Sequence, residues 1–135
     1  MEDEGAERAL RSARTAAAIL VAAPVVLVAV AAAVPLEPSA PSLATPAVLA
    51  GLLAPALGFH LYRRMQEAGT GRFVRATIVS LACTEAGATL GVVAFLLSRE
   101  PLALVGVAMH VLLAGAIWPS RERLESFLST GQGGG

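Results

Sequence analysis

The chain has 135 residues, of which 56% are hydrophobic and 15% are charged, and its formal net charge is zero. A neutral chain gives no support for nucleic-acid binding, and four apolar stretches of membrane length within 135 residues leave no room for a separate soluble domain. The composition is typical of an integral membrane protein in contact with the lipid bilayer.

Four long apolar stretches follow one another along the chain. A bilayer core of about 30 Å takes roughly 20 helical residues, and continuous apolar runs favour helices over barrel strands, which would alternate apolar and polar residues. We therefore predict an all-α, integral membrane four-helix bundle that forms a single domain over residues 1–135. The predicted spans cover residues 15–34, 46–62, 73–97 and 102–118.

The first stretch follows a leader, MEDEGAER, that carries acidic as well as basic residues. Because of this mixed charge, and because the apolar run is longer than a usual signal core, we interpret it as a retained span and not as a cleaved signal peptide. Pro24 lies inside this span and Pro55 inside the second one. Each removes a backbone donor, which predicts a kink.

The arginines predict the orientation, because short loops rich in basic residues stay on the cytoplasmic side. They precede the first span, join the second to the third and follow the fourth, as Arg8, Arg11, Arg14, Arg63, Arg64, Arg72, Arg75, Arg121 and Arg123. Arg99 lies on the other side, and the proline-rich connection 35–45 has no basic residue, which is expected of an external, non-helical loop. Both termini should therefore be cytoplasmic. The bias toward arginine, alanine, glycine and proline suggests a GC-rich bacterial genome, and hence the bacterial inner membrane.

The cytoplasmic end of the second span carries side chains that suit the membrane interface, namely His60, Tyr62, Arg63 and Arg64. Trp118 has the same expected role at the end of the fourth span. His60 and His110 differ too much in depth to hold one haem iron, and the chain has no HxxxH or ExxH spacing and a single cysteine, Cys83. No cofactor and no metal site is therefore predicted.

Glu85 lies near the middle of the third apolar run. An acidic side chain at the centre of a membrane helix costs roughly 2.5 to 3.5 kcal/mol, so such residues usually face a partner, a cavity or an ion path. Thr89 lies one turn further on, where its hydroxyl is placed to hydrogen-bond the carboxyl group. Glu85 is therefore the first candidate for an intramembrane polar site.

Small residues occupy both faces of the third predicted helix. Ala82 and Ala88 flank Glu85, and Gly87 with Gly91 forms a GxxxG spacing. Such a spacing marks close helix contact, either with a helix of the same chain or with another subunit. Both alternatives remain open at this point.

The fourth stretch carries an imidazole within a stripe of small residues, formed by Ala103, Gly106, His110 and Ala114. Counted inward from the turn at residues 98–101, which joins the third stretch to the fourth, Glu85 is roughly 18 Å deep and His110 roughly 12 Å deep. A Glu side chain bridges this difference directly or through a water, so a Glu85–His110 pair is one hypothesis. The alternative is that His110 is a packing residue.

The segment PSRERLESFL (119–128) places Leu124, Phe127 and Leu128 on one side and charges on the other. This pattern predicts a short amphipathic helix on the cytoplasmic membrane surface. The chain then ends in GQGGG, which we expect to be flexible, so that 119–135 forms a surface helix and tail.

Two parts of the chain resemble proteins of the rotary ATP synthase membrane sector. The loop RRMQEAGTGRFVR (63–75) and the helix ATIVSLACTEAGATLGVVAFLL (76–97) resemble subunit c, with Glu85 in the position of its proton-carrying acid. In length, topology and the placement of AGLLAPALGFHLYRR (50–64) and GRFVRATIVSLACTEAG (71–87), the chain is similar to ATP synthase protein I. That resemblance implies a small four-helix membrane protein that is linked to assembly of the c ring.

The sequence shows no nucleophile with a base, no metal set and no phosphate loop, which argues against an enzyme. We expect a small non-enzymatic subunit or assembly partner of a larger, bioenergetic membrane complex, in contact with other membrane subunits or with copies of itself. The main alternative is an oligomeric ion- or proton-coupled transporter, with Glu85 as carrier and His110 as relay.

Overall fold

The computed structural model describes residues 2–67 and 72–130, and within these ranges every regular element is helical. The predicted all-α fold is therefore confirmed. The helices are α1 (Glu2–Ala33), α2 (Ala44–Glu67), α3 (Phe73–Ser98), α4 (Val105–Ala116) and α5 (Arg121–Thr130), and two 3-10 turns, η1 (Pro41–Leu43) and η2 (Pro101–Leu104), precede α2 and α4.

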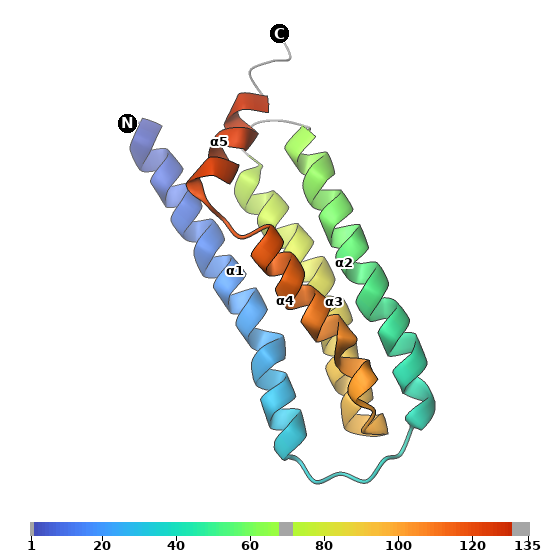
Figure 1. Cartoon of the computed structure of the whole chain (residues 1–135). Coiled ribbons are helices and arrows are strands. Elements are labelled where there is room, and N and C mark those ends of the chain that lie inside the picture. The colour runs from blue at the N-terminus through green and yellow to red at the C-terminus, as the bar shows by residue number, and fades with distance from the viewer. Residues whose placement is uncertain (1, 68–71, 131–135) are drawn as a thin grey trace.

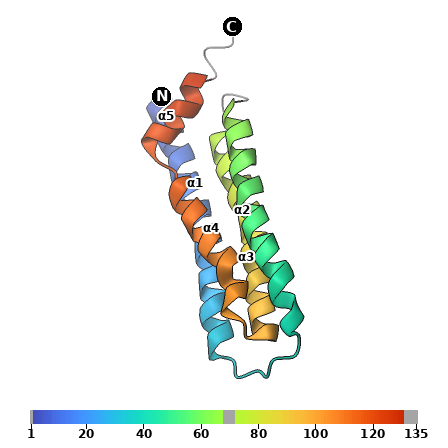
Figure 2. The same ribbon diagram turned by 45° about the vertical axis from the view of Figure 1, so that its right-hand side comes forward.

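The helices α1 to α4 form a bundle in which successive helices run in opposite directions (Figure 1). α3 contacts α1, α2 and α4, and its buried side contains many residues small enough to let these neighbours approach closely. α5 lies at the end of the bundle where α1 begins and α2 ends, and the connections after α1 and α3 lie at the opposite end (Figures 1 and 2).

Three helical segments of the described chain are long and apolar enough to cross a membrane: Glu4–Ala33, Pro41–Glu67 and Phe73–Ser98. The fourth predicted span is divided, because Pro101–Ala116 is followed by a bend of 71° into α5; the described chain has up to four spans if this bent pair counts as one. Large apolar side chains project outward, and Leu53, for example, is 68% exposed. Such a surface is compatible with a multi-pass membrane protein.

The helix boundaries differ from the predicted spans mainly at the end where α5 lies. α1 begins at Glu2, because its leader has acidic and basic residues at the i, i+4 spacing that stabilises exposed helices, such as Glu4 and Arg8. The connection predicted at 35–45 is shorter in the structure, since η1 begins at Pro41. The tail predicted at 131–135 lies outside the described residues.

Arg99 ties the far end of α1 to α3. It caps α3 in the left-handed conformation, with φ 58°, and its guanidinium donates hydrogen bonds to the carbonyls of Ala31 (3.0 Å), Val34 and Leu36 (3.1 Å). The last carbonyls of a helix have no backbone donor within that helix, and they form the negative end of its dipole. The guanidinium therefore serves α1 both as a donor and as a charge.

Glycines bring α2, α3 and α4 into backbone contact. A Cβ atom added to Gly51 on α2 would lie 2.6 Å from the Cα of Gly106 on α4, and one added to Gly87 on α3 would lie 2.7 Å from a side-chain atom of α2. One added to Gly91 would collide with the carbonyl oxygen of Ala103. The GxxxG pair of α3 is therefore used for packing within the chain.

α5 packs its apolar side on the bundle. Phe127 is 1% exposed, and its ring meets the rings of Tyr62 and Phe73 edge-on, with centroids 5.5 and 5.4 Å apart. Such edge-to-face pairs add to the gain from burying the rings. The predicted amphipathic C-terminal helix is thus present, and its apolar side covers the ends of α2 and α3.

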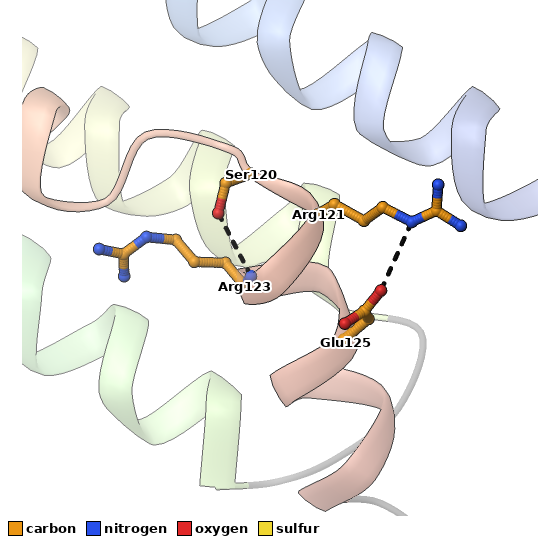
Figure 3. A network of polar contacts seen from close by, with 4 residues as sticks. All are labelled: Ser120, Arg121, Arg123 and Glu125. Carbon is orange, nitrogen blue, oxygen red and sulfur yellow. Dashed lines mark hydrogen bonds and ion pairs between the residues drawn. The ribbon is translucent and has the colours of Figure 1, made fainter.

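Polar contacts fix the start of α5 (Figure 3). The hydroxyl of Ser120 accepts a hydrogen bond of 3.3 Å from the backbone N–H of Arg123, the arrangement that caps a helix N-terminus. Arg121 and Glu125 form an exposed ion pair of 3.4 Å one turn apart. The cap explains why the chain resumes a helix directly after the bend, whereas the exposed pair adds little.

Candidate functional site

His110 is buried at the centre of the bundle, and both of its ring nitrogens have hydrogen-bond partners. The residue is 0% exposed and lies on α4. Its Nε2 lies 3.1 Å from the carbonyl oxygen of Leu20 on α1, and its Nδ1 lies 2.5 Å from Oγ1 of Thr84 on α3. The imidazole therefore joins three helices.

The partner of Nε2 decides the tautomer of the ring. A carbonyl oxygen only accepts, so Nε2 of His110 carries a hydrogen and donates it to Leu20. In the neutral ring Nδ1 is then an acceptor, and Thr84 donates its hydroxyl hydrogen to it. The carbonyl of Leu20 thus fixes the hydrogen on Nε2, whereas the hydroxyl hydrogen of Thr84 has two acceptors within reach, Nδ1 and the carbonyl of Leu81.

Pro24 explains why the carbonyl of Leu20 is available. In an α-helix this carbonyl would accept from the backbone N–H four residues further on, but that residue is Pro24, which has no N–H. An unpaired carbonyl is costly in an apolar setting, and a proline is tolerated in such a helix where another group satisfies it. His110 is that group.

Thr84 belongs to a row of buried hydroxyl residues on α3. Thr77, Ser80 and Thr84 are each 0% exposed, and their spacing of three and four residues places them on one helix face. The hydroxyls of Thr77 and Thr84 reach backbone carbonyls of α3, at 3.0 and 2.9 Å. Oγ of Ser80 has no hydrogen-bond partner among the described residues. The face that α3 turns inward is therefore polar at its centre.

Gly58 lets α2 cover this row. A Cβ atom at this position would lie 2.7 Å from Cγ2 of Thr84 and 2.8 Å from the carbonyl oxygen of Ser80. A larger residue would hold α2 away from α3. The imidazole thus lies among α1, α3 and α4, with α2 behind Thr84.

Glu85 lies beside this site and forms no hydrogen bond among the described residues. Its side chain is half-buried, and it directly follows Thr84 on α3. Both ring nitrogens have other partners, so the direct Glu85–His110 hydrogen bond considered from the sequence is absent. Thr89 is half-buried too, and in this part of the structure its hydroxyl does not bond to Glu85.

The small residues predicted to pack between helices fall into two groups. Those buried in the bundle are Gly87, Ala88, Gly91, Ala103, Gly106 and Ala114. Ala82 differs, because it is exposed on the outer side of α3. It lies two residues from Thr84, or about 200° around the helix from the centre of the buried face.

The residues predicted at the membrane interface also differ in their exposure. His60, Arg63, Arg64 and Trp118 are exposed. Tyr62 is 2% exposed, because α5 folds over it and Phe127 packs against its ring. Tyr62 is therefore a core residue of the end of the bundle and not a surface anchor.

The sequence analysis did not single out Thr84 or the carbonyl of Leu20. Each left a signal: a proline inside an apolar helix frees the carbonyl four residues before it, and Thr77, Ser80 and Thr84 have helical spacing. Whether the free carbonyl of Leu20 meets the imidazole of His110 depends on how α1 packs against α4, and residue spacing within each helix does not define that packing.

The described part of the chain holds no group of three or more His, Cys, Asp or Glu side chains that could hold a metal ion. Comparisons with protein-family models, with curated proteins and with solved structures give no match to this chain. The function is therefore inferred from the residues and their arrangement.

Proposed function

We propose that the chain is a multi-pass protein of the bacterial inner membrane with both termini in the cytoplasm, and that it acts as a small, non-enzymatic subunit or assembly partner of a larger membrane complex. An apolar groove on the outer side of α2 and α3 carries this proposal. The distribution of the arginines supports the orientation.

The arginines other than Arg99 lie toward the end of the bundle where α5 lies. Basic segments stay on the cytoplasmic side, so this end would face the cytoplasm. Arg14 donates a hydrogen bond of 3.1 Å to the carbonyl of Pro119, which joins the basic start of α1 to the junction of α4 and α5. At the other end, the charge of Arg99 is held against the carbonyls of Ala31, at the end of α1, and of Leu36, just after it.

The groove between α2 and α3 opens on the bundle surface and has a volume of about 510 Å³. Its lining is apolar and rich in small side chains: Ala50, Leu53, Ala54, Ala56, Leu57, Cys83, Ala86, Gly87 and Leu90. Membrane helices associate through close van der Waals packing at small residues, because lipid tails already supply an apolar environment. A shallow groove of this kind suits a single transmembrane helix of a partner.

The resemblance of the second and third helical segments to ATP synthase protein I and to subunit c suggests which complex to test first. Under this proposal the partner helix belongs to the membrane sector of a rotary ATP synthase, and the chain takes part in its assembly. The hydrogen bonds of His110 agree with a non-enzymatic role, because each ring nitrogen is already bonded within the chain.

A second candidate function is ion- or proton-coupled transport by an oligomer, with Glu85 as the carrier. It is favoured by the position of Glu85, which is half-buried, lacks a hydrogen bond among the described residues and directly follows Thr84, the partner of His110. Ionisable residues in such positions often mark ion pathways. A chain of this size would need further subunits to enclose a path.

Cys83 offers a direct test, because it is the one cysteine of the chain and lines the groove. The full chain carrying a photoactivatable maleimide on Cys83 is irradiated in native membranes. Adducts with another membrane protein, identified by mass spectrometry, are the expected result. Adducts with a second copy would favour a homo-oligomer, and proton movement in liposomes that is lost in Glu85→Gln would favour transport.

A matched pair of variants locates the contact. Ala86→Leu fills the groove and should abolish the adducts, whereas Ala82→Leu changes an exposed alanine of α3 outside the groove and should not. Adducts that persist in Ala86→Leu would show that the groove is not the docking surface.

A further inference from the structure

We infer that His110 is a proton-binding site, at which Nδ1 of the ring takes up a proton from water while Nε2 stays bonded to the carbonyl of Leu20. The inference goes beyond the proposed function, because it concerns the interior of the bundle and applies to a subunit and to a transporter alike. It rests on hydrogen-bond geometry, on burial and on a second buried hydroxyl near the ring.

In the neutral state the ring has one open position for a proton. The carbonyl of Leu20, 3.1 Å from Nε2, accepts the hydrogen on that nitrogen. The lone pair is therefore on Nδ1, which faces Oγ1 of Thr84 at 2.5 Å. An added proton has a single destination in the ring.

The same heavy atoms also satisfy the protonated ring. Once Nδ1 of His110 carries a hydrogen, it donates to Oγ1 of Thr84, and the hydroxyl of Thr84 turns its own hydrogen to the carbonyl of Leu81, 2.9 Å away. Hydronium gives up the proton and becomes water, no covalent bond within the protein breaks, and the hydrogen bond between Thr84 and Nδ1 reverses its direction. The partners of the ring therefore satisfy both the neutral and the protonated state.

Glu85 is the acidic residue next to this site on α3. It directly follows Thr84 on α3, which places a carboxyl group next to the partner of the ring. Residues 16–33 of α1 and 44–59 of α2 contain no titratable side chain, α4 contains His110 alone, and the next titratable residue of α2 is the exposed His60. Cys83 of α3 points to α2, with Sγ 3.8 Å from the carbonyl of Ala54. Glu85 is therefore the group that stabilises a positive ring.

Ser80 gives the proton a route toward the arginine-rich end. It lies four residues before Thr84 on the same face, where Cβ atoms are about 5 to 6 Å apart, a separation that one water bridges. Its hydroxyl is fully buried and has no partner among the described residues, the usual sign of a water site. Thr77 continues the row toward the start of α3.

The test uses the full chain in lipid bilayers with ¹⁵N-labelled histidine. The chain has two histidines, and the exposed His60 serves as an internal reference. At about pH 8 the His110 signals should show hydrogen on Nε2 only, and on acidification to about pH 5 a second hydrogen should appear on Nδ1, reversibly and with unchanged circular dichroism. A ring that stays neutral until helical signal is lost, or that carries hydrogen on Nδ1 at high pH, would overturn the inference.

Three variants separate proton binding from packing. Thr84→Val keeps the shape but removes the acceptor for the Nδ1 hydrogen, and should weaken proton binding about ten- to a hundredfold. Thr89→Val removes a hydroxyl on another side of α3 and should change nothing. Ser80→Ala should slow proton exchange at the ring without shifting its equilibrium. Equal titration of Thr84→Val and the unchanged chain would contradict the role of Thr84, and an unchanged exchange rate in Ser80→Ala would contradict the route.

Discussion

Pro24 on α1 removes a backbone donor, and His110 on α4 supplies the donor that is missing. The two residues act on one atom, the carbonyl oxygen of Leu20, which Pro24 frees and His110 binds at 3.1 Å. A helix end would normally be needed to expose such an acceptor. Here a proline exposes it within a continuous helix, so that an imidazole joins α1 to the rest of the bundle.

This relationship predicts that Pro24 and His110 are energetically coupled. His110→Leu leaves the carbonyl of Leu20 unpaired and should cost about 1 to 3 kcal/mol of unfolding free energy. In a Pro24→Ala chain the new N–H at residue 24 satisfies that carbonyl, so the same change should cost about 1 kcal/mol less. Reversible unfolding in mixed detergent micelles measures the four chains of this cycle.

Pro55 provides the control, because it also lies inside a helix but frees the carbonyl of Gly51, which does not meet the imidazole. A cycle of Pro55→Ala with His110→Leu should be additive. Additivity in the Pro24 cycle as well would show that His110 does not compensate for the proline.

Gly106 and Gly115 lie on the same helix and should respond oppositely to alanine. A Cβ atom added at Gly106 would lie 3.0 Å from the Cα of Gly51 and 2.9 Å from the carbonyl oxygen of Gly87. Because both neighbours are backbone, the helices must separate, at a cost of about 1 to 3 kcal/mol. A Cβ at Gly115 meets nothing within 4 Å. Gly115→Ala should therefore be neutral or stabilise by up to about 1 kcal/mol.

Thermal unfolding in detergent, followed by circular dichroism, compares the two alanine variants with the unchanged chain. The glycine contacts within the chain would be in doubt if Gly106→Ala unfolded at the same temperature as Gly115→Ala.

The all-helical fold was predictable because continuous apolar runs of membrane length define helices by themselves. The polar site was predictable only in part. His110 stood out as an imidazole in an apolar stretch, but its partner on α3 is Thr84 and not Glu85. One residue corresponds to about 100° of rotation, so the partner depends on the direction from which α4 approaches α3. Only the packing of several helices defines that direction.

Tyr62 shows the same limit at the end of the bundle. Beside two arginines at the end of an apolar run, a tyrosine is typical of a membrane interface. The structure buries it because the chain bends by 71° between α4 and α5, which places Phe127 on the ring of Tyr62. An amphipathic pattern indicates that α5 has an apolar side, but it does not indicate whether lipid or protein covers that side.

Phe127 should be the residue that holds α5 on the bundle. Phe127→Ala removes both edge-to-face ring contacts and most of a fully buried side chain, and should weaken docking of α5 by about 3 to 5 kcal/mol. Leu128→Ala is the control, because Leu128 is 43% exposed, and it should change docking by less than about 0.5 kcal/mol. Hydrogen exchange of α5 amides measures docking directly. Equal protection of α5 in both variants would show that Phe127 does not hold it.

Arg99 combines a left-handed backbone with hydrogen bonds to α1, and two substitutions separate these effects. Arg99→Ala loses the charged hydrogen bonds to Ala31, Val34 and Leu36, worth about 2 to 3 kcal/mol, and still places a Cβ in the left-handed conformation. Arg99→Gly loses the same bonds but relieves the backbone, and should be more stable than Arg99→Ala by about 1 kcal/mol. Unfolding midpoints in detergent should therefore rank the unchanged chain first, Arg99→Gly second and Arg99→Ala last. If Arg99→Gly matched the unchanged chain, the guanidinium would contribute nothing to holding α1; if Arg99→Ala matched Arg99→Gly, the left-handed cap would carry no cost.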